Sequence, residues 1–119
     1  MSGAVFGLSL VVLRAADVAA LAAFYGDLGV GFTWEQHGEG PRHATARLGD
    51  TVLEIYPQTA GGSSSSGARI GLIVRSIDAA LTSVARPGAI IAPPEDSPWG
   101  RRCVLRDPAG HAVELAERP

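Results

Sequence analysis

Two short segments of this chain repeat one unusual pattern, in which a turn leads into a strand with a single glutamate among aliphatic residues. The first segment covers 49–56 and contains Glu54, and the second covers 107–116 and contains Glu114. Side chains alternate between the two faces of a strand, so each glutamate lies opposite its aliphatic neighbours. An ionised carboxylate is costly to bury without a partner. The repeat therefore predicts one structural unit used twice, with both carboxylates facing a shared space.

Other signals divide the chain into two halves with the same order of elements. Asp17 and Ser76 are expected to cap helices, which Gly29 and Pro87-Gly88 would end. We expect strands over 8–13, 31–37, 42–48, 51–57, 69–75, 89–92, 101–106 and 111–116, and a Pro-rich loop over 93–100. The expected fold class is α+β, a single domain over 1–119. It would consist of two βαβββ modules, 5–58 and 69–119, joined by a flexible Gly/Ser linker over 59–68.

Composition excludes several classes of protein. The 119 residues suffice for one domain with a core, and the net charge is −2. The only basic cluster is Arg101-Arg102, so we expect no nucleic-acid partner. The one cysteine, Cys103, excludes an internal disulfide and fits a reducing compartment. The chain lacks a charged leader pattern and an apolar run long enough to span a membrane, so we expect a soluble, cytoplasmic protein.

A set of short motifs extends over nearly the whole chain. It consists of Leu13-Arg14 with Asp17, Phe24-Tyr25, Leu28-Gly29, Trp99-Gly100, and Asp107-Pro108-Ala109-Gly110 ahead of Glu114. As a set, these resemble the vicinal oxygen chelate superfamily, which includes glyoxalase I, bleomycin-resistance proteins, fosfomycin-resistance proteins and extradiol dioxygenases. The resemblance implies that two βαβββ modules form a cupped mixed sheet around a central ligand cavity, often in a homodimer.

The resemblance also implies four metal positions, which fall here on Leu10, Glu54, Arg69 and Glu114. Leu10 has no donor atom, and Arg69 is a permanent cation. Two glutamates with waters would hold Mg²⁺ weakly, so a divalent metal is a disfavoured alternative and no cofactor is expected. We hypothesise that Arg69 takes the electrostatic role of the metal and offsets both carboxylates. The alternative is that Arg69 is simply solvated at the start of its strand.

Three aromatic residues are further candidates for ligand contact. Trp34 would line the cavity or belong to the core, and Trp99 would cover the cavity mouth or anchor its loop on the sheet edge. Tyr56 is expected to share a face with Glu54, where its hydroxyl would bind a ligand or satisfy that carboxylate.

The histidines and the cysteine carry weaker signals. His43 and His111 are expected to be turn or surface residues, and His37 to be solvated. Cys103 fits a small core residue better than a nucleophile. The sequence has no Ser/His/Asp order that would indicate a hydrolase.

These observations favour metal-independent binding of a small organic molecule, with sequestration of an antibiotic or toxin as one form of that function. The ligand would contact Glu54, Arg69, Glu114, Tyr56, Trp34, Trp99 and Leu10. The alternative is an isomerase, lyase or dioxygenase that uses Glu54 or Glu114 as a general base, or a divalent metal. Fold alone does not separate the two, because this fold hosts both binding proteins and enzymes.

Overall fold

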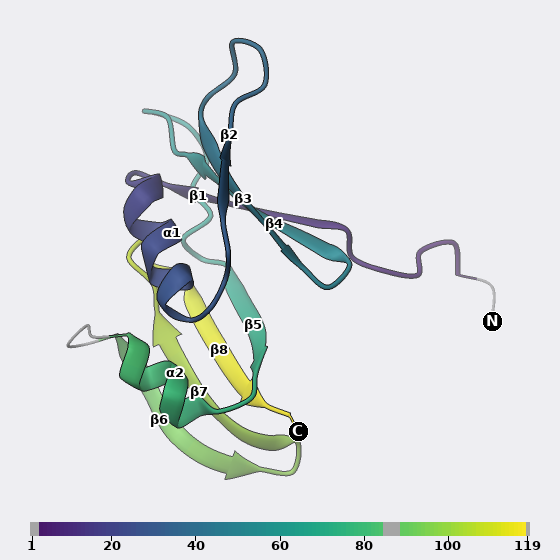
Figure 1. Cartoon of the computed structure of the whole chain (residues 1–119), viewed down its shortest axis with the longest axis vertical. Helices are drawn as coiled ribbons and strands as arrows, with labels where there is room; N and C mark the ends of the chain where they lie inside the picture. The colour runs from purple at the N-terminus through teal and green to yellow at the C-terminus, as the bar shows by residue number, and fades with distance from the viewer. Residues whose placement is uncertain (1–2, 85–88, 119) are drawn as a thin grey trace.

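The computed structural model describes residues 3–84 and 89–118, and within them one order of elements occurs twice (Figure 1). The first half contains β1 (Leu10–Ala15), α1 (Val18–Asp27), β2 (Thr33–Glu35), β3 (His43–Leu48) and β4 (Thr51–Pro57). The second half contains β5 (Arg69–Val74), α2 (Ile77–Ser83), β6 (Ile90–Ser97), β7 (Gly100–Arg106) and β8 (Ala112–Glu117). The α+β class and the repeated strand-helix-strand-strand-strand order are confirmed.

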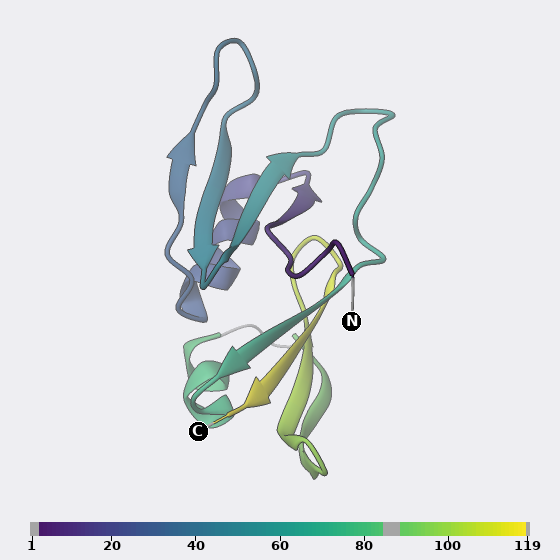
Figure 2. The ribbon, with the colours of Figure 1, turned by 90° about the vertical axis from the view of Figure 1, so that its right-hand side faces the viewer.

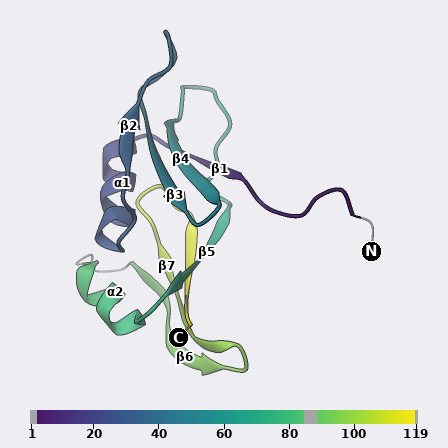
Figure 3. The same ribbon diagram turned by 45° about the vertical axis from the view of Figure 1, so that its right-hand side comes forward.

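The strands of each half form their own four-stranded mixed sheet. The strand orders are β1-β4-β3-β2 and β5-β8-β7-β6, with β1 parallel to β4 and β5 parallel to β8. Figure 2 shows the first sheet above the second, with the segment between β4 and β5 running along one side. In Figures 1 and 3 both helices lie on the same side of the molecule. Each sheet therefore has one face covered by a helix and one open face.

Buried and less buried side chains alternate along β4 and β8, which shows which face of each strand packs against the core. Leu53 and Ile55 on β4 and Val113 and Leu115 on β8 are buried in the core, as the sequence predicts. The helices add the buried side chains Leu21, Phe24, Tyr25, Ile77 and Ala80 to the same core. Because neighbouring residues of a strand point to opposite faces, Glu54 and Glu114 lie on the open faces.

The predicted helix caps are confirmed, and one predicted loop is wrong. Asp17 accepts a hydrogen bond from the backbone N–H of Ala20, and Ser76 accepts one from Ala79. The expected loop over 93–100 instead continues β6 to Ser97. Its two prolines are tolerated because β6 is an edge strand whose pairing with β7 shifts register twice. The expected helix stop at Pro87-Gly88 lies outside the described residues.

A buried hydrogen-bond network ties the two halves together, and we call Tyr25, Ser65, Asp107 and His111 the Asp107 network. The Tyr25 hydroxyl on α1 donates to Oδ2 of Asp107 over 2.7 Å, in the turn between β7 and β8. His111 Nδ1 lies 2.8 Å from the same oxygen, and its Nε2 lies 2.7 Å from Ser65 Oγ. Ser65 in turn accepts a hydrogen bond from the backbone N–H of Arg14 on β1. The network thus joins the first half, the connecting segment and the second half.

The protonation states inside the Asp107 network follow from its geometry. Burial raises the pKa of Tyr25 far above its usual range, and the hydrogen bond to Asp107 raises it further, so Tyr25 remains a donor. A carboxylate only accepts, so His111 Nδ1 carries the hydrogen that it donates to Asp107, and Nε2 is hydrogen-bonded to Ser65 Oγ. His111 is fully buried, which corrects the expectation of a turn or surface histidine. Its ring is buried because both of its nitrogens have partners.

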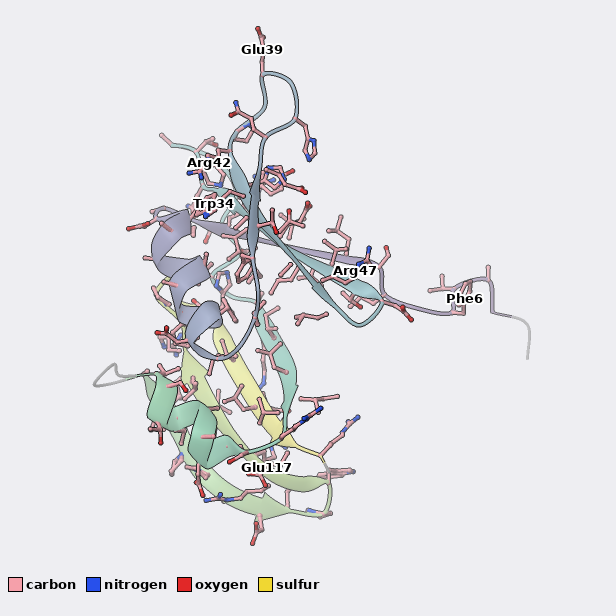
Figure 4. All side chains as sticks on the ribbon, in the orientation of Figure 1. Phe6, Trp34, Glu39, Arg42, Arg47 and Glu117 are labelled. Atoms are coloured by element: carbon pink, nitrogen blue, oxygen red, sulfur yellow. The ribbon has the colours of Figure 1, made fainter. Side chains whose placement is uncertain are left out.

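A long N-terminal arm, residues 3–9, extends away from the two sheets (Figure 3). Phe6 lies on this arm and is fully exposed (Figure 4). Within the described residues, neither helix is long and apolar enough to cross a membrane.

Replacing Tyr25 by Phe tests the Asp107 network. The substitution keeps the ring and removes the donor to a buried carboxylate, so we expect a loss of about 1–3 kcal/mol in the free energy of unfolding. Urea unfolding measures it. The matched control is Tyr56→Phe, which removes the same hydroxyl from the open face of the first sheet and should cost less than about 0.5 kcal/mol. Equal losses from both variants would contradict the role assigned to the network.

Candidate functional site

Glu54 lies on the open face of the first sheet, opposite Thr45 on β3. The Thr45 hydroxyl lies 3.2 Å from Oε2 of Glu54 and also 3.2 Å from Oε1 of Glu35 on β2. A hydroxyl has one hydrogen, so it donates to one of the two carboxylates at a time. The open face therefore holds two carboxylates that share one protein donor. Glu35 and Thr45 were not singled out by the sequence, although their positions in the alternation of β2 and β3 match that of Glu54.

His43 lies on the same open face of the first sheet as Glu54, but its side chain is buried. Its side chain is 1% exposed, and its ring stacks on Tyr56 with 4.1 Å between ring centroids and an angle of 10°. The expectation of a surface histidine is therefore wrong, because Tyr56 and His37 cover the ring. Tyr56 lies on the face of Glu54, as predicted, and the Arg14 guanidinium lies 5.3 Å from its ring centroid. Its ring contacts are with His43 and Arg14, and the protein donor nearest to Glu54 is the Thr45 hydroxyl.

Glu114 occupies the equivalent place on the second sheet, where its carboxylate forms ion pairs with two arginines. Arg69 Nη2 donates to Oε1 of Glu114 over 2.7 Å, and Arg102 Nη2 donates to the same oxygen. The hydrogen bond from Arg69 lowers the pKa of Glu114 below its usual value, and the charge of Arg102 lowers it further, while burial acts in the opposite direction. Arg69 is about half exposed but ion-paired, so it is not simply solvated. Arg102 on β7 is a site residue that sequence reasoning missed.

The two glutamates have separate partners. Glu54 lies among Thr45, Glu35 and His43 in the first sheet, and Glu114 lies between two arginines in the second. Within the described residues Arg69 pairs with Glu114 alone, so its guanidinium offsets one carboxylate rather than both. One hollow is lined by 4–9 and Asp50, and another by Arg14, Thr59, Gly62 and Ser63; neither includes Glu54, Arg69 or Glu114.

The remaining candidates are distributed over the surface. Leu10 begins β1, is about half exposed, and pairs with Val52 rather than with Glu54. Trp34 pairs with Ala44, so it lies on the face opposite Glu54, and the Arg42 guanidinium lies 4.2 Å from its ring centroid. Figure 4 shows Trp34 and Arg42 close together on the β2–β3 hairpin. Trp99 is 79% exposed, so it does not anchor its loop on the sheet edge.

Ser65, His111 and Asp107 form a Ser-His-Asp arrangement that the order of these residues in the chain did not reveal. Its distances are those of a hydrogen-bonded catalytic triad. Its polar groups are, however, all used by the fold. Asp107 Oδ1 accepts from the backbone N–H groups of Ala109 and His111, and Ser65 Oγ accepts from Arg14. We interpret the arrangement as a structural contact that holds the two halves of the chain and the connecting segment together.

The sequence profile of the Glyoxalase/Bleomycin resistance protein/Dioxygenase superfamily matches residues 7–115. The chain belongs to this superfamily. The match confirms the resemblance read from the motifs. No curated protein sequence matches the chain.

Several solved structures share the whole fold of this chain. TnmS3, an antibiotic-binding protein from Streptomyces sp. CB03234, is 22% identical with a TM-score of 0.76, covering 99% of this chain and 100% of its own. A superfamily member from Sphaerobacter thermophilus DSM 20745 is 25% identical with a TM-score of 0.73, covering 96% and 98%. The bleomycin-binding protein of Streptomyces verticillus, solved with copper(II)-bleomycin, is 27% identical with a TM-score of 0.62, covering 98% and 100%.

The residues at the superfamily's four metal positions do not fit a divalent ion. The strand neighbours of the two glutamates, Val12 on β1 and Gly71 on β5, have no side-chain donor atom. Leu10 has none either, and Arg69 and Arg102 occupy the carboxylate of Glu114. A cation placed there would have to displace two guanidinium groups.

The pKa of Glu114 predicts a specific acid dependence. A carboxylate whose pKa is lowered in the folded state stabilises the fold above its unfolded pKa, and the contribution is lost as pH falls through the folded value. The difference in free energy of unfolding between the wild type and Glu114→Gln should therefore be largest above about pH 5 and shrink as pH falls below about 4. Urea unfolding across this range measures the difference.

Glu39→Gln is the control for this measurement, since Glu39 is exposed at the tip of the β2–β3 hairpin (Figure 4). Its difference from the wild type should remain small throughout. A Glu114→Gln difference that stays constant from neutral to acid pH would show that the ion pairs with Arg69 and Arg102 contribute nothing.

Proposed function

We propose that the chain binds a small organic molecule of the bleomycin type on the open faces of its two sheets. The observation that carries the proposal is the position of Glu54 and Glu114. Both lie on the faces opposite the core. The neighbouring side chains of the same strands are buried in that core, which fixes the position of each strand. A binding surface needs polar groups at fixed positions next to apolar or aromatic surface. The open faces have this composition.

The first sheet supplies the groups that suit a cationic or hydrogen-bonding ligand. Glu35 and Glu54 share the hydroxyl of Thr45, so one carboxylate is available to a ligand donor. Tyr56 adds an aromatic ring beside them, fixed by its stack on His43. The second sheet adds Arg69 and Arg102 around Glu114, which suit acceptor groups of a ligand. Together the two faces match a molecule with several polar groups of both kinds.

The state of Glu114 favours binding over general-base catalysis. A general base works best when its pKa lies near the operating pH, which for a carboxylate requires a raised pKa. The two arginines lower the pKa of Glu114 instead, which makes this carboxylate a weaker base. The same ion pairs hold it in a fixed position, which is useful for recognition.

Two similar proteins of known structure support a chemical class for the ligand. The bleomycin-binding protein of Streptomyces verticillus, at 27% identity over nearly the whole chain, is solved with copper(II)-bleomycin. TnmS3, whose likeness concerns the fold alone, binds an antibiotic. Superfamily membership together with this neighbour supports an antibiotic-like ligand for the present chain.

Calorimetric titration with bleomycin, in buffer containing EDTA, tests the proposal. We expect saturable binding to the wild type. Glu54→Gln and Glu114→Gln should each weaken binding about tenfold or more, because each removes a charged hydrogen-bond partner worth about 1.5–3 kcal/mol. Glu39→Gln, the matched change on the hairpin tip, should bind as the wild type does.

An assay of methylglyoxal with glutathione separates binding from turnover. Under the proposal no product forms, with or without added Ni²⁺ or Zn²⁺. Product formation by the wild type would overturn the binding function, as would the absence of saturable bleomycin binding. Equal affinity for the wild type and both site variants would overturn the assignment of Glu54 and Glu114 to the binding surface.

A further inference from the structure

The β2–β3 hairpin of the first sheet gathers three side chains able to bind a metal. They are Glu35 at the end of β2, His37 in the connecting loop, and His43 at the start of β3. One donor atom of each lies within 4.8 Å of the other two. Figure 4 marks this hairpin by Trp34 and Arg42 on its sides and Glu39 at its tip. The superfamily's four metal positions involve none of these three residues.

The tautomer of His43 directs a lone pair into this cluster. Its Nδ1 lies 3.1 Å from the carbonyl oxygen of Pro41, and a carbonyl only accepts, so Nδ1 carries the hydrogen. In the neutral ring Nε2 is then an acceptor. Within the described residues, Nε2 is a buried side-chain polar atom without a hydrogen-bond partner. A buried polar atom without a hydrogen-bond partner is energetically unfavourable. A bound ion or donor group at Nε2 would remove this cost.

The atoms around Nε2 of His43 are also acceptors. Oε2 of Glu54 lies 3.6 Å away and Oε1 of Glu35 lies 3.8 Å away, both beyond hydrogen-bond length. The hydroxyl of Thr45 satisfies only one of the two carboxylates at a time. The neighbouring cation Arg42 is held over the ring of Trp34, on the other face of β2. The protein thus brings several lone pairs together, and within the described residues no arginine or lysine forms an ion pair with them.

We propose that Glu35, His37 and His43 form a binding site for a divalent transition metal ion, with Zn²⁺ as the best match. Zinc binds imidazole nitrogen and carboxylate oxygen at about 2.0–2.2 Å in tetrahedral geometry, which places its ligand atoms roughly 3.4 Å apart. His37 Nε2 lies 3.4 Å from Glu35 Oε1, and His43 Nε2 lies 3.8 Å from the same oxygen. The donor atoms are therefore already near the spacing that the ion requires.

The surroundings of His43 are those of a metal ligand. A ligating imidazole usually donates its other N–H to a carbonyl or carboxylate, which fixes the ring, and the carbonyl of Pro41 has this role here. The stack on Tyr56 holds the plane of the ring. Two imidazoles and one carboxylate leave a fourth position for water or a ligand group. Glu54 Oε2 lies 3.6 Å from His43 Nε2.

Titration of the untagged, EDTA-treated full-length chain with Zn²⁺ alone tests the site. We expect one saturable ion per chain, and Co²⁺ at the same site should give the visible absorption of a tetrahedral complex. His37→Ala and Glu35→Gln should each weaken Zn²⁺ binding by about tenfold or more, since loss of even an outer partner costs about that much. Both side chains are partly or largely exposed, so these variants should fold.

Glu39→Gln removes a carboxylate from the same hairpin without touching the three ligands and should bind Zn²⁺ as the wild type does. Absence of saturable binding to the wild type would overturn the proposal, because the unpaired nitrogen of His43 would then take a proton rather than a metal ion. Unchanged affinity in His37→Ala and Glu35→Gln would overturn it as well. The outcome is independent of bleomycin binding, which is measured with EDTA present.

Discussion

The carboxylate of Asp107 joins parts of the chain that are far apart in sequence. It accepts from Tyr25 on α1 and from His111 at the start of the last hairpin strand, and His111 reaches Ser65 in the connecting segment. Because Tyr25, Asp107 and His111 are buried, each depends on its partner to avoid an unsatisfied polar atom. The relative placement of the two sheets therefore rests on a polar contact as well as on the apolar core. The Gly/Ser-rich connection, which by composition favours a flexible linker, is held at Ser65.

The same repeat gives the two open faces different electrostatic characters. On the first sheet Glu54 has a second carboxylate, a shared hydroxyl and an unpaired imidazole nitrogen around it. On the second sheet the equivalent Glu114 is bound by two guanidinium groups, which lower its pKa. One module thus presents lone pairs that attract a cation, and the other presents a carboxylate already paired. The zinc site that we propose lies on the first sheet, where these lone pairs gather, and apart from the superfamily's metal positions.

Local sequence signals predicted the secondary-structure elements. Most of the features that they did not predict depend on strand pairing between residues distant in the sequence. The alternation around Glu54 and Glu114 and the caps Asp17 and Ser76 depend on near neighbours, and they were predicted correctly. Pro93 and Pro94 indicated a loop, but an edge strand accommodates prolines that a central strand would not.

Residue placement across strands was harder to predict. The face of Trp34 follows from the register of β2 against β3, which a three-residue strand does not encode by itself. His43 and His111 each have one burying partner farther along the chain, Tyr56 and Ser65, in addition to a near one, so their neighbours in sequence alone did not predict their burial.

We propose that a ligand binds on the open faces, opposite the helices. Backbone amide chemical shifts of the isotope-labelled chain, followed as bleomycin is added in the presence of EDTA, locate the binding surface. We expect the shift changes to concentrate in β3, β4, β5 and β8, around Glu54 and Glu114. Shifts confined to α1, α2 and the arm over 3–9 would contradict it.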